Sequence, residues 1–149
     1  MEKVFLNDLL TQNIHTCSFT FKEIADSNVS YRLNPKAASV GFIYRHIGES
    51  MLMFGYFFGL PVDVENTTLG KQDEGQGSKL ESSRQLIDKG YEMLRRIIEQ
   101  TSAEAWLQTV ETPFFGSVSR ARLFAHILYH NAYHAGQIGL TLKRASGVQ

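Results

Sequence analysis

Three histidines, His126, His130 and His134, recur at four-residue intervals in a stretch that we expect to be helical. Four residues turn an α-helix by about 40° beyond one full turn, so these side chains share one narrow arc. Leu123 and Ile127 lie on or beside the same arc. An arc with such apolar neighbours faces a protein core. The spacing therefore predicts a row of inward-facing imidazoles.

Buried imidazoles of this kind are typical metal ligands. Burying a ring nitrogen without a partner is costly, and neutral imidazole binds zinc, nickel, copper or iron well. His130 and His134 have the spacing of the helical zincin motif, but Asn131 stands where that motif has its glutamate, which excludes such a protease. His126 and Gln137 lie on the same arc and are expected to be core residues or outer-sphere partners of an ion.

A third ligand has to come from another helix. Two helical turns separate His126 from His134 by about 11 Å, so the whole row cannot converge on one ion. His46 is the best candidate because apolar residues flank it on an inward face of a second helix, and His15 is a weaker one. Glu49 follows His46 by one helical turn, but the carboxylate ladder of di-iron bundles is missing. We expect Glu49 to be solvated or an outer-sphere residue.

Four long segments with helical periodicity would position these side chains. They cover about Glu2–Asp26, Val40–Gly59, Leu80–Gln100 and Arg120–Arg144. Ser39 and Ser119 are the expected N-caps of the second and fourth helices. Residues 61–79 predict a long surface loop between the second and third helices, and residues 109–118 predict a small hairpin after a short turn through Trp106. We expect an all-α fold, a four-helix bundle that is antiparallel or has a crossover and forms one domain over residues 1–149.

The composition narrows the class of protein. Fifteen basic residues balance fifteen acidic ones, so no net charge attracts nucleic acid or an anionic membrane. A single cysteine, Cys17, allows no internal disulfide, and the start of the chain lacks a signal-peptide pattern. The most apolar run, residues 51–62, is too short to span a bilayer. We therefore expect a cytoplasmic protein with no nucleic-acid or membrane partner.

Residues 51–58 are apolar on all sides of their helix, which is more than one core requires. Such a segment is either buried within its own chain or covered by another copy. From this pattern we expect a symmetric homodimer that packs through the second helix or its neighbours.

The two histidine-bearing segments together resemble the DinB family, which is related to the YfiT-like metal-dependent hydrolases. The resemblance rests on Ser-Val-Gly-Phe-Ile-Tyr-Arg-His46-Ile-Gly-Glu and on the more specific string His126-x3-His130-x3-His134-Ala-Gly-Gln137. It extends over nearly the whole chain in length and helix order. It implies a DinB/YfiT-like four-helix bundle, often a homodimer, with a divalent metal ion on His46, His130 and His134.

The resemblance also implies candidate activities. Relatives include thiol S-transferases that use small-molecule thiols such as bacillithiol or mycothiol, and a zinc or nickel ion would there hold the thiolate. We therefore expect transfer of a low-molecular-weight thiol to an electrophile. The alternatives are metal-assisted hydrolysis, with His126 or Glu49 relaying a proton, and a non-catalytic, stress-associated bundle that binds a metal or ligand. Typical members have an arginine where this chain has Ala135, which favours the non-catalytic alternative, and many have a tryptophan where it has Phe57 and Phe58.

Overall fold

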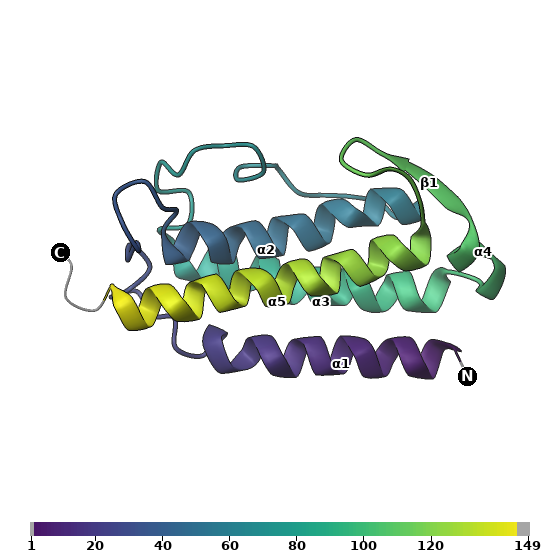
Figure 1. Cartoon of the computed structure of the whole chain (residues 1–149), viewed down its shortest axis with the longest axis horizontal. Helices are drawn as coiled ribbons and strands as arrows, with labels where there is room; N and C mark the ends of the chain where they lie inside the picture. Colours follow the sequence, from purple (N-terminus) through teal and green to yellow (C-terminus); the bar gives the residue numbers. More distant parts are fainter. Residues whose placement is uncertain (1, 146–149) are drawn as a thin grey trace.

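The computed structural model describes residues 2–145 and consists mainly of four long helices (Figure 1). The helical elements are α1 (Glu2–Phe21), α2 (Val40–Phe54), the 3-10 helix η1 (Gly55–Phe58), α3 (Leu80–Gln100), the short α4 (Ala103–Leu107) and α5 (Arg120–Arg144). Strands β1 (Thr109–Thr112) and β2 (Gly116–Ser119) form an antiparallel hairpin between α4 and α5. The predicted all-α bundle, its short turn and its hairpin are confirmed. None of the helices within residues 2–145 is long and apolar enough to cross a membrane.

Local capping sets the start of the two helices that carry the candidate ligands. The Ser39 hydroxyl accepts a hydrogen bond from the Phe42 amide at 3.2 Å, and the Ser119 hydroxyl accepts one from the Arg122 amide at 3.2 Å. Each of these bonds satisfies an amide that has no partner within its own helix. Both predicted N-caps are therefore confirmed, and with them the starting points of α2 and α5.

Two helix ends differ from the predicted ones. α1 ends at Phe21, earlier than the predicted Asp26. The side chain of Asn28 accepts from the Ala25 amide and donates to the Glu23 carbonyl, both at 2.9 Å, so a side-chain-stabilised turn replaces further helix. α2 tightens into η1 after residue 54, and the chain then turns at residue 59, a glycine with a φ of 72°.

A crossover connection between α2 and α3 sets the directions of the helices. α2 and α3 run one way along the bundle, and α1 and α5 run the other way (Figure 1). The chain must therefore travel back along α2 before α3 begins, which explains the length of the connection between residues 59 and 80. Asp73 holds the returning chain near the start of α2, since its Oδ2 accepts from the Ser39 amide at 2.7 Å and pairs with Arg32 at 2.9 Å. This path lays the middle of the connection alongside α2.

The core lies between the long helices, with α2 packed against both α3 and α5. Its fully buried apolar side chains include Ile47, Leu94, Ile97, Ile98, Leu123, Ile127 and Ile138. α2 and α3 approach closely because glycines face the neighbouring helix. A Cβ atom on Gly48 would lie 2.8 Å from the Leu86 backbone, and one on Gly90 would lie 2.7 Å from the Met51 Cε. This tight contact fixes α2, and therefore its histidine, relative to the rest of the bundle.

The apolar segment of residues 51–58 is mostly covered by its own chain. Met51 and Leu52 are buried, whereas Tyr56 is 75% exposed. Burial within the chain accounts for most of the pattern, and the homodimer stays a prediction. Large apolar side chains exposed on α1 and α5 are Val4, Phe5, Leu9, Phe19, Tyr129, Tyr133 and Leu140.

Candidate metal centre

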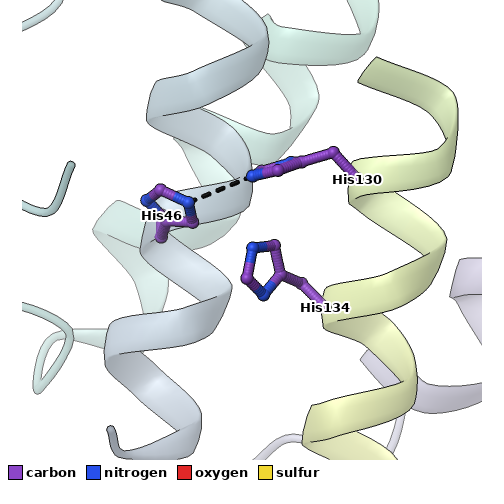
Figure 2. A group of neighbouring side chains, drawn as sticks. All are labelled: His46, His130 and His134. Carbon is purple, nitrogen blue, oxygen red and sulfur yellow. Dashed lines mark hydrogen bonds between the residues drawn. The ribbon is translucent and has the colours of Figure 1, made fainter. Parts of the chain in front are cut away.

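Three of the predicted histidines converge between α2 and α5 (Figure 2). One ring nitrogen of each of His46, His130 and His134 lies within 4.8 Å of the others, and the Nε2 atoms of His46 and His130 are 3.1 Å apart. Tetrahedral zinc with bonds of about 2.0–2.1 Å separates its nitrogen ligands by about 3.4 Å, so small side-chain rotations reach that geometry. The ring of His126 lies beside the group, 6.0 Å from that of His130, and His15 is exposed on α1. The structure brings together the three predicted ligands and leaves the other two histidines outside.

Burial keeps these imidazoles neutral at physiological pH. It is the main reason that the pKa of His46 falls from 6.5 to about 4; repulsion from His134 adds to the effect and Glu49 opposes it. Burial and then repulsion from the neighbouring imidazoles lower the pKa of His130 to about 3. Burial also lowers the pKa of His134, against the effect of its hydrogen bond to Gln137. Neutral imidazole is the form that binds metals, so all three side chains are already in the protonation state that metal binding requires.

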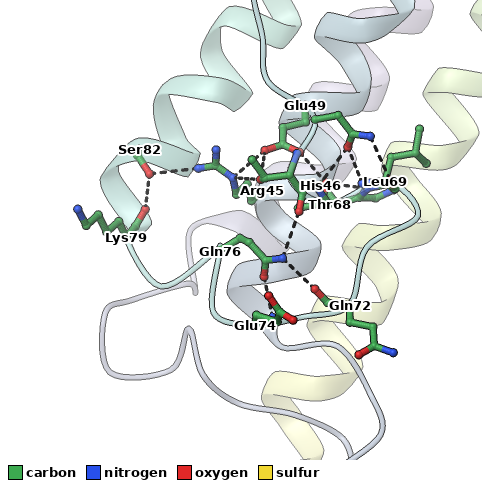
Figure 3. Close-up of polar contacts among 12 residues, drawn as sticks. Arg45, His46, Glu49, Thr68, Leu69, Gln72, Glu74, Gln76, Lys79 and Ser82 are labelled. Carbon is green, nitrogen blue, oxygen red and sulfur yellow. Dashed lines mark hydrogen bonds and ion pairs between the residues drawn. The ribbon is translucent and has the colours of Figure 1, made fainter.

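A buried carboxylate determines which nitrogen of His46 carries the proton (Figure 3). The Thr68 hydroxyl oxygen lies 2.7 Å from Glu49 Oε2 and 3.1 Å from His46 Nδ1. A carboxylate only accepts, so the hydroxyl donates to Glu49 and its oxygen accepts from His46 Nδ1–H. This tautomer leaves a lone pair on Nε2, the nitrogen that faces His130.

His134 reaches the same tautomer through a partner on its own helix. Its Nδ1 lies 2.6 Å from the Gln137 Oε1, and the amide nitrogen of Gln137 donates to the Tyr133 hydroxyl at 3.2 Å. A carbonyl oxygen only accepts, so Nδ1 of His134 carries the hydrogen and Nε2 carries the lone pair. Gln137 therefore fixes the tautomer of His134, as an outer-sphere partner of an ion would.

His130 has a buried Nδ1 with no hydrogen-bond partner in the part of the chain that the structure describes. Its Nε2 faces the Nε2 lone pair of His46, so a proton has to lie between these two nitrogens unless a cation does. With the hydrogen of His130 on Nδ1 instead, a divalent ion between the rings would accept lone pairs from all three neutral imidazoles. The donor set fits zinc or nickel, because both ions favour imidazole nitrogen.

Glu49 is buried and not solvated, and the Thr68 hydroxyl links it to His46. It is 0% exposed, and its Oε1 lies 2.7 Å from the Nε of Arg45. The amide and hydroxyl of Thr67 donate to it at 3.0 and 2.5 Å, in addition to the hydroxyl of Thr68. Its lone pairs are therefore used within the protein. The same bonds attach the middle of the long connection to α2.

Sequence reasoning did not find Arg45, Thr67 or Thr68 as parts of the site. The two threonines lie in an irregular segment, where no periodicity indicates which side chains face inward. The only signal was the length of the connection, which is typical of functional loops.

Two pockets flank the three histidines. The first, of about 490 Å³, is lined by His46, His134, Thr68 and Gln137 together with apolar residues. The second, of about 500 Å³, includes His130 in its wall. Within residues 2–145, no fourth histidine, cysteine or carboxylate joins the group. Three protein ligands beside open space are typical of catalytic metal sites, whereas structural zinc sites have four.

A helical bundle with a crossover connection and inward-facing histidines on two adjacent helices defines the class of this protein. The chain belongs to the DinB superfamily, whose profile matches residues 9–138. The family resemblance inferred from the histidine motifs is confirmed.

Two solved structures share the fold. One is the crystal structure of TT2238, a four-helix bundle protein, with 15% identity and a TM-score of 0.65 over 91% of this chain and 97% of that one. The other is the conserved protein of locus from Enterococcus faecalis, with 12% identity and a TM-score of 0.71 over 99% of each chain. A comparison with curated proteins gives no match. The structural similarities support the bundle architecture alone.

Proposed function

We propose that the protein is a metal-dependent transferase that joins a low-molecular-weight thiol to an electrophile. A zinc or nickel ion would be held by His46, His130 and His134. The observation that carries this proposal is the position of the three-nitrogen group between two pockets, which offers separate space for two reactants. When bound, the ion would lower the pKa of the thiol and so favour the thiolate near neutral pH.

The alternatives have less support in the site. Hydrolysis requires a general base beside the ion, and the acceptor positions of Glu49 are filled by Arg45, Thr67 and Thr68. His126 is the remaining candidate for a proton relay. A non-catalytic metal site would be expected to have a fourth protein ligand and no adjoining pocket. The replacement of the family arginine by a buried Ala135 is the feature in favour of this last alternative.

The expected setting follows from this chemistry. Small thiols stay reduced in the cytoplasm, so we place the reaction and the protein there, with the thiol and the electrophile as its partners. The homodimer is part of the same proposal. Light scattering at micromolar concentration should give twice the mass of the chain, and a monomer would contradict it.

Elemental analysis and a thiol-transfer assay test the proposal. Untagged protein should contain about one zinc or nickel ion per chain, and initial rates of thioether formation should fall on chelation and recover when the ion is restored. Bacillithiol, mycothiol and cysteine would serve as thiols. His130→Ala should lose both metal and rate, whereas His15→Ala, an exposed histidine outside the site, should keep both.

The other outcomes separate the alternatives. A stoichiometric ion with no turnover on any thiol would indicate a non-catalytic site. Metal-dependent cleavage of esters or amides without a thiol would indicate a hydrolase. Protein without a bound ion, and without affinity for added zinc or nickel, would overturn the metal assignment.

A further inference from the structure

The second pocket has a distinctive wall, which we call the aromatic pocket. It is formed in large part by Phe54, Phe57, Phe114, Phe115, His126 and His130. These residues come from the end of α2, η1, the tip of the hairpin and α5. Its volume of about 500 Å³ lies within the usual range for small-molecule sites, about 300–1,000 Å³.

The wall of the aromatic pocket carries no acidic or strongly basic side chain among the described residues. The wall also includes the imidazole of His126, whose pKa is lowered by burial. The nearby guanidinium of Arg122 stacks on Phe115, with its carbon 5.9 Å from the ring centroid, and is not part of the wall. Among these side chains a charged guest would lose its hydration without gaining a counter-ion, so the wall itself favours a neutral molecule.

The arrangement of the rings favours a flat guest. His126 stacks on Phe54 at 5.9 Å with an interplanar angle of 25°, and Phe115 meets His126 edge-on at 4.6 Å. Phe114 is tilted by 30° to Phe54 and lies at 81° to Phe57. The rings thus pack on one another both face to face and edge to face, the contacts that a flat aromatic guest makes as well.

The hairpin side of the aromatic pocket is left open to solvent. Phe114 and Phe115 are 47% and 40% exposed, although large apolar side chains usually find cover. His130 is shared between this pocket and the histidine triad, so a guest would lie directly beside the candidate ion.

We propose that the aromatic pocket binds a neutral, planar aromatic electrophile, the acceptor of the thiol. This assignment rests on the proposed transfer function, with the thiol approaching from the pocket beside His46 and His134. In the reaction, the thiol sulfur forms a bond to the electrophilic carbon, the leaving group departs with its electron pair, and the thiol proton passes to solvent.

Fluorescent probes test the pocket separately from the reaction. N-phenyl-1-naphthylamine is neutral and aromatic, and 1-anilinonaphthalene-8-sulfonate has the same rings with an added anionic group. The neutral probe should bind with one-to-one saturation and at least tenfold tighter than the anionic one. The comparison is made with a chelator present, so that the side chains of the wall and not an ion set the preference.

Ring removal provides matched variants. Phe114→Ala and Phe115→Ala should each weaken the neutral probe by about tenfold, the scale of a lost aromatic pair. Phe19→Ala removes a phenylalanine of similar exposure (53%) from α1 and should leave binding unchanged. Circular dichroism would verify that all three variants fold. In the transfer assay, Phe114→Ala should raise KM for an aromatic electrophile and leave KM for the thiol unaltered.

The outcomes are distinguishable. Saturable probe binding that depends on Phe114 and Phe115, without any thiol transfer, would support the pocket and overturn the reaction. Equal binding of the anionic probe, or equal weakening in Phe19→Ala, would overturn the assignment of a neutral aromatic guest.

Discussion

Replacing Thr68 with valine should weaken zinc binding without unfolding the bundle. Valine keeps the shape of threonine but removes the hydroxyl that joins His46 Nδ1 to Glu49. Glu49 retains its bonds from Arg45 and Thr67, so the carboxylate stays paired and the connection stays attached to α2. The group left without any hydrogen-bond partner is therefore Nδ1 of His46.

The magnitude follows from what the ion demands of His46. Coordination through Nε2 requires the hydrogen on Nδ1, where the variant offers no acceptor. Without the ion, the ring is free to move its proton to Nε2, so the penalty is specific to the metal-bound state. A buried donor left without a partner costs about 1–3 kcal/mol, which corresponds to about a 5- to 150-fold weaker affinity.

The assay is competition for zinc with a chromophoric chelator, applied to four proteins. Thr68→Ser restores the hydroxyl and should restore affinity close to the wild type. Thr11→Val changes an exposed threonine on α1 and should have no effect. If Thr68→Val binds zinc as tightly as the wild type, or if Thr68→Ser is as weak as the valine variant, the proposed control of the His46 tautomer is wrong.

Three further predictions concern the histidines and the packing that positions them. With the metal chelated, urea unfolding midpoints should fall as pH drops from 6.5 toward 4. Histidines of the unfolded chain bind protons in this pH range, whereas folded His46 and His130, with pKa values of about 4 and 3, do not, so acid favours the unfolded state. His46→Gln should therefore flatten the dependence of the unfolding midpoint on pH. His130→Ala should abolish tight metal binding and His126→Ala should retain the ion, so chelation should lower the Tm of the wild type and of His126→Ala but not that of His130→Ala; the reverse pattern in equilibrium dialysis would contradict the ligand assignment. Gly48→Ala should destabilise the protein by about 1–3 kcal/mol, because the new methyl group meets the backbone of α3 at 2.8 Å; an unchanged denaturation midpoint would show that the contact relaxes.

The candidate ligands could be predicted from the sequence because helical periodicity carries spatial information. The four-residue spacing of His130 and His134 places both side chains on one arc, and the apolar neighbours of His46 indicate that it faces inward. The capping serines define where these helices begin. The structure adds that α2 and α5 are adjacent and brings the three rings together.

The surroundings of the ligands could not be predicted in the same way. Thr68 meets His46 across 22 positions of sequence, and its place depends on the path of an irregular connection. The expectation for Glu49 stayed open between solvent and an outer-sphere role, because its partners come from that same connection. The aromatic pocket depends on how the hairpin folds over η1, which no local pattern specifies. The end of α1 was predicted too late because the Asn28 turn competes with further helix.

The hairpin has a consequence for how such a protein diversifies. Its tip, residues 113–115, provides one wall of the aromatic pocket, while the three histidines belong to α2 and α5. Neither strand contributes a histidine of the triad. The residues at 113–115 can be substituted without breaking the turn, because Gly116, with a φ of 63°, supplies its left-handed backbone. Substitutions at the tip therefore alter the shape of the aromatic pocket without moving the three histidines. For the proposed reaction, selection for a different electrophile would have three adjacent codons on which to act, independently of the three histidines.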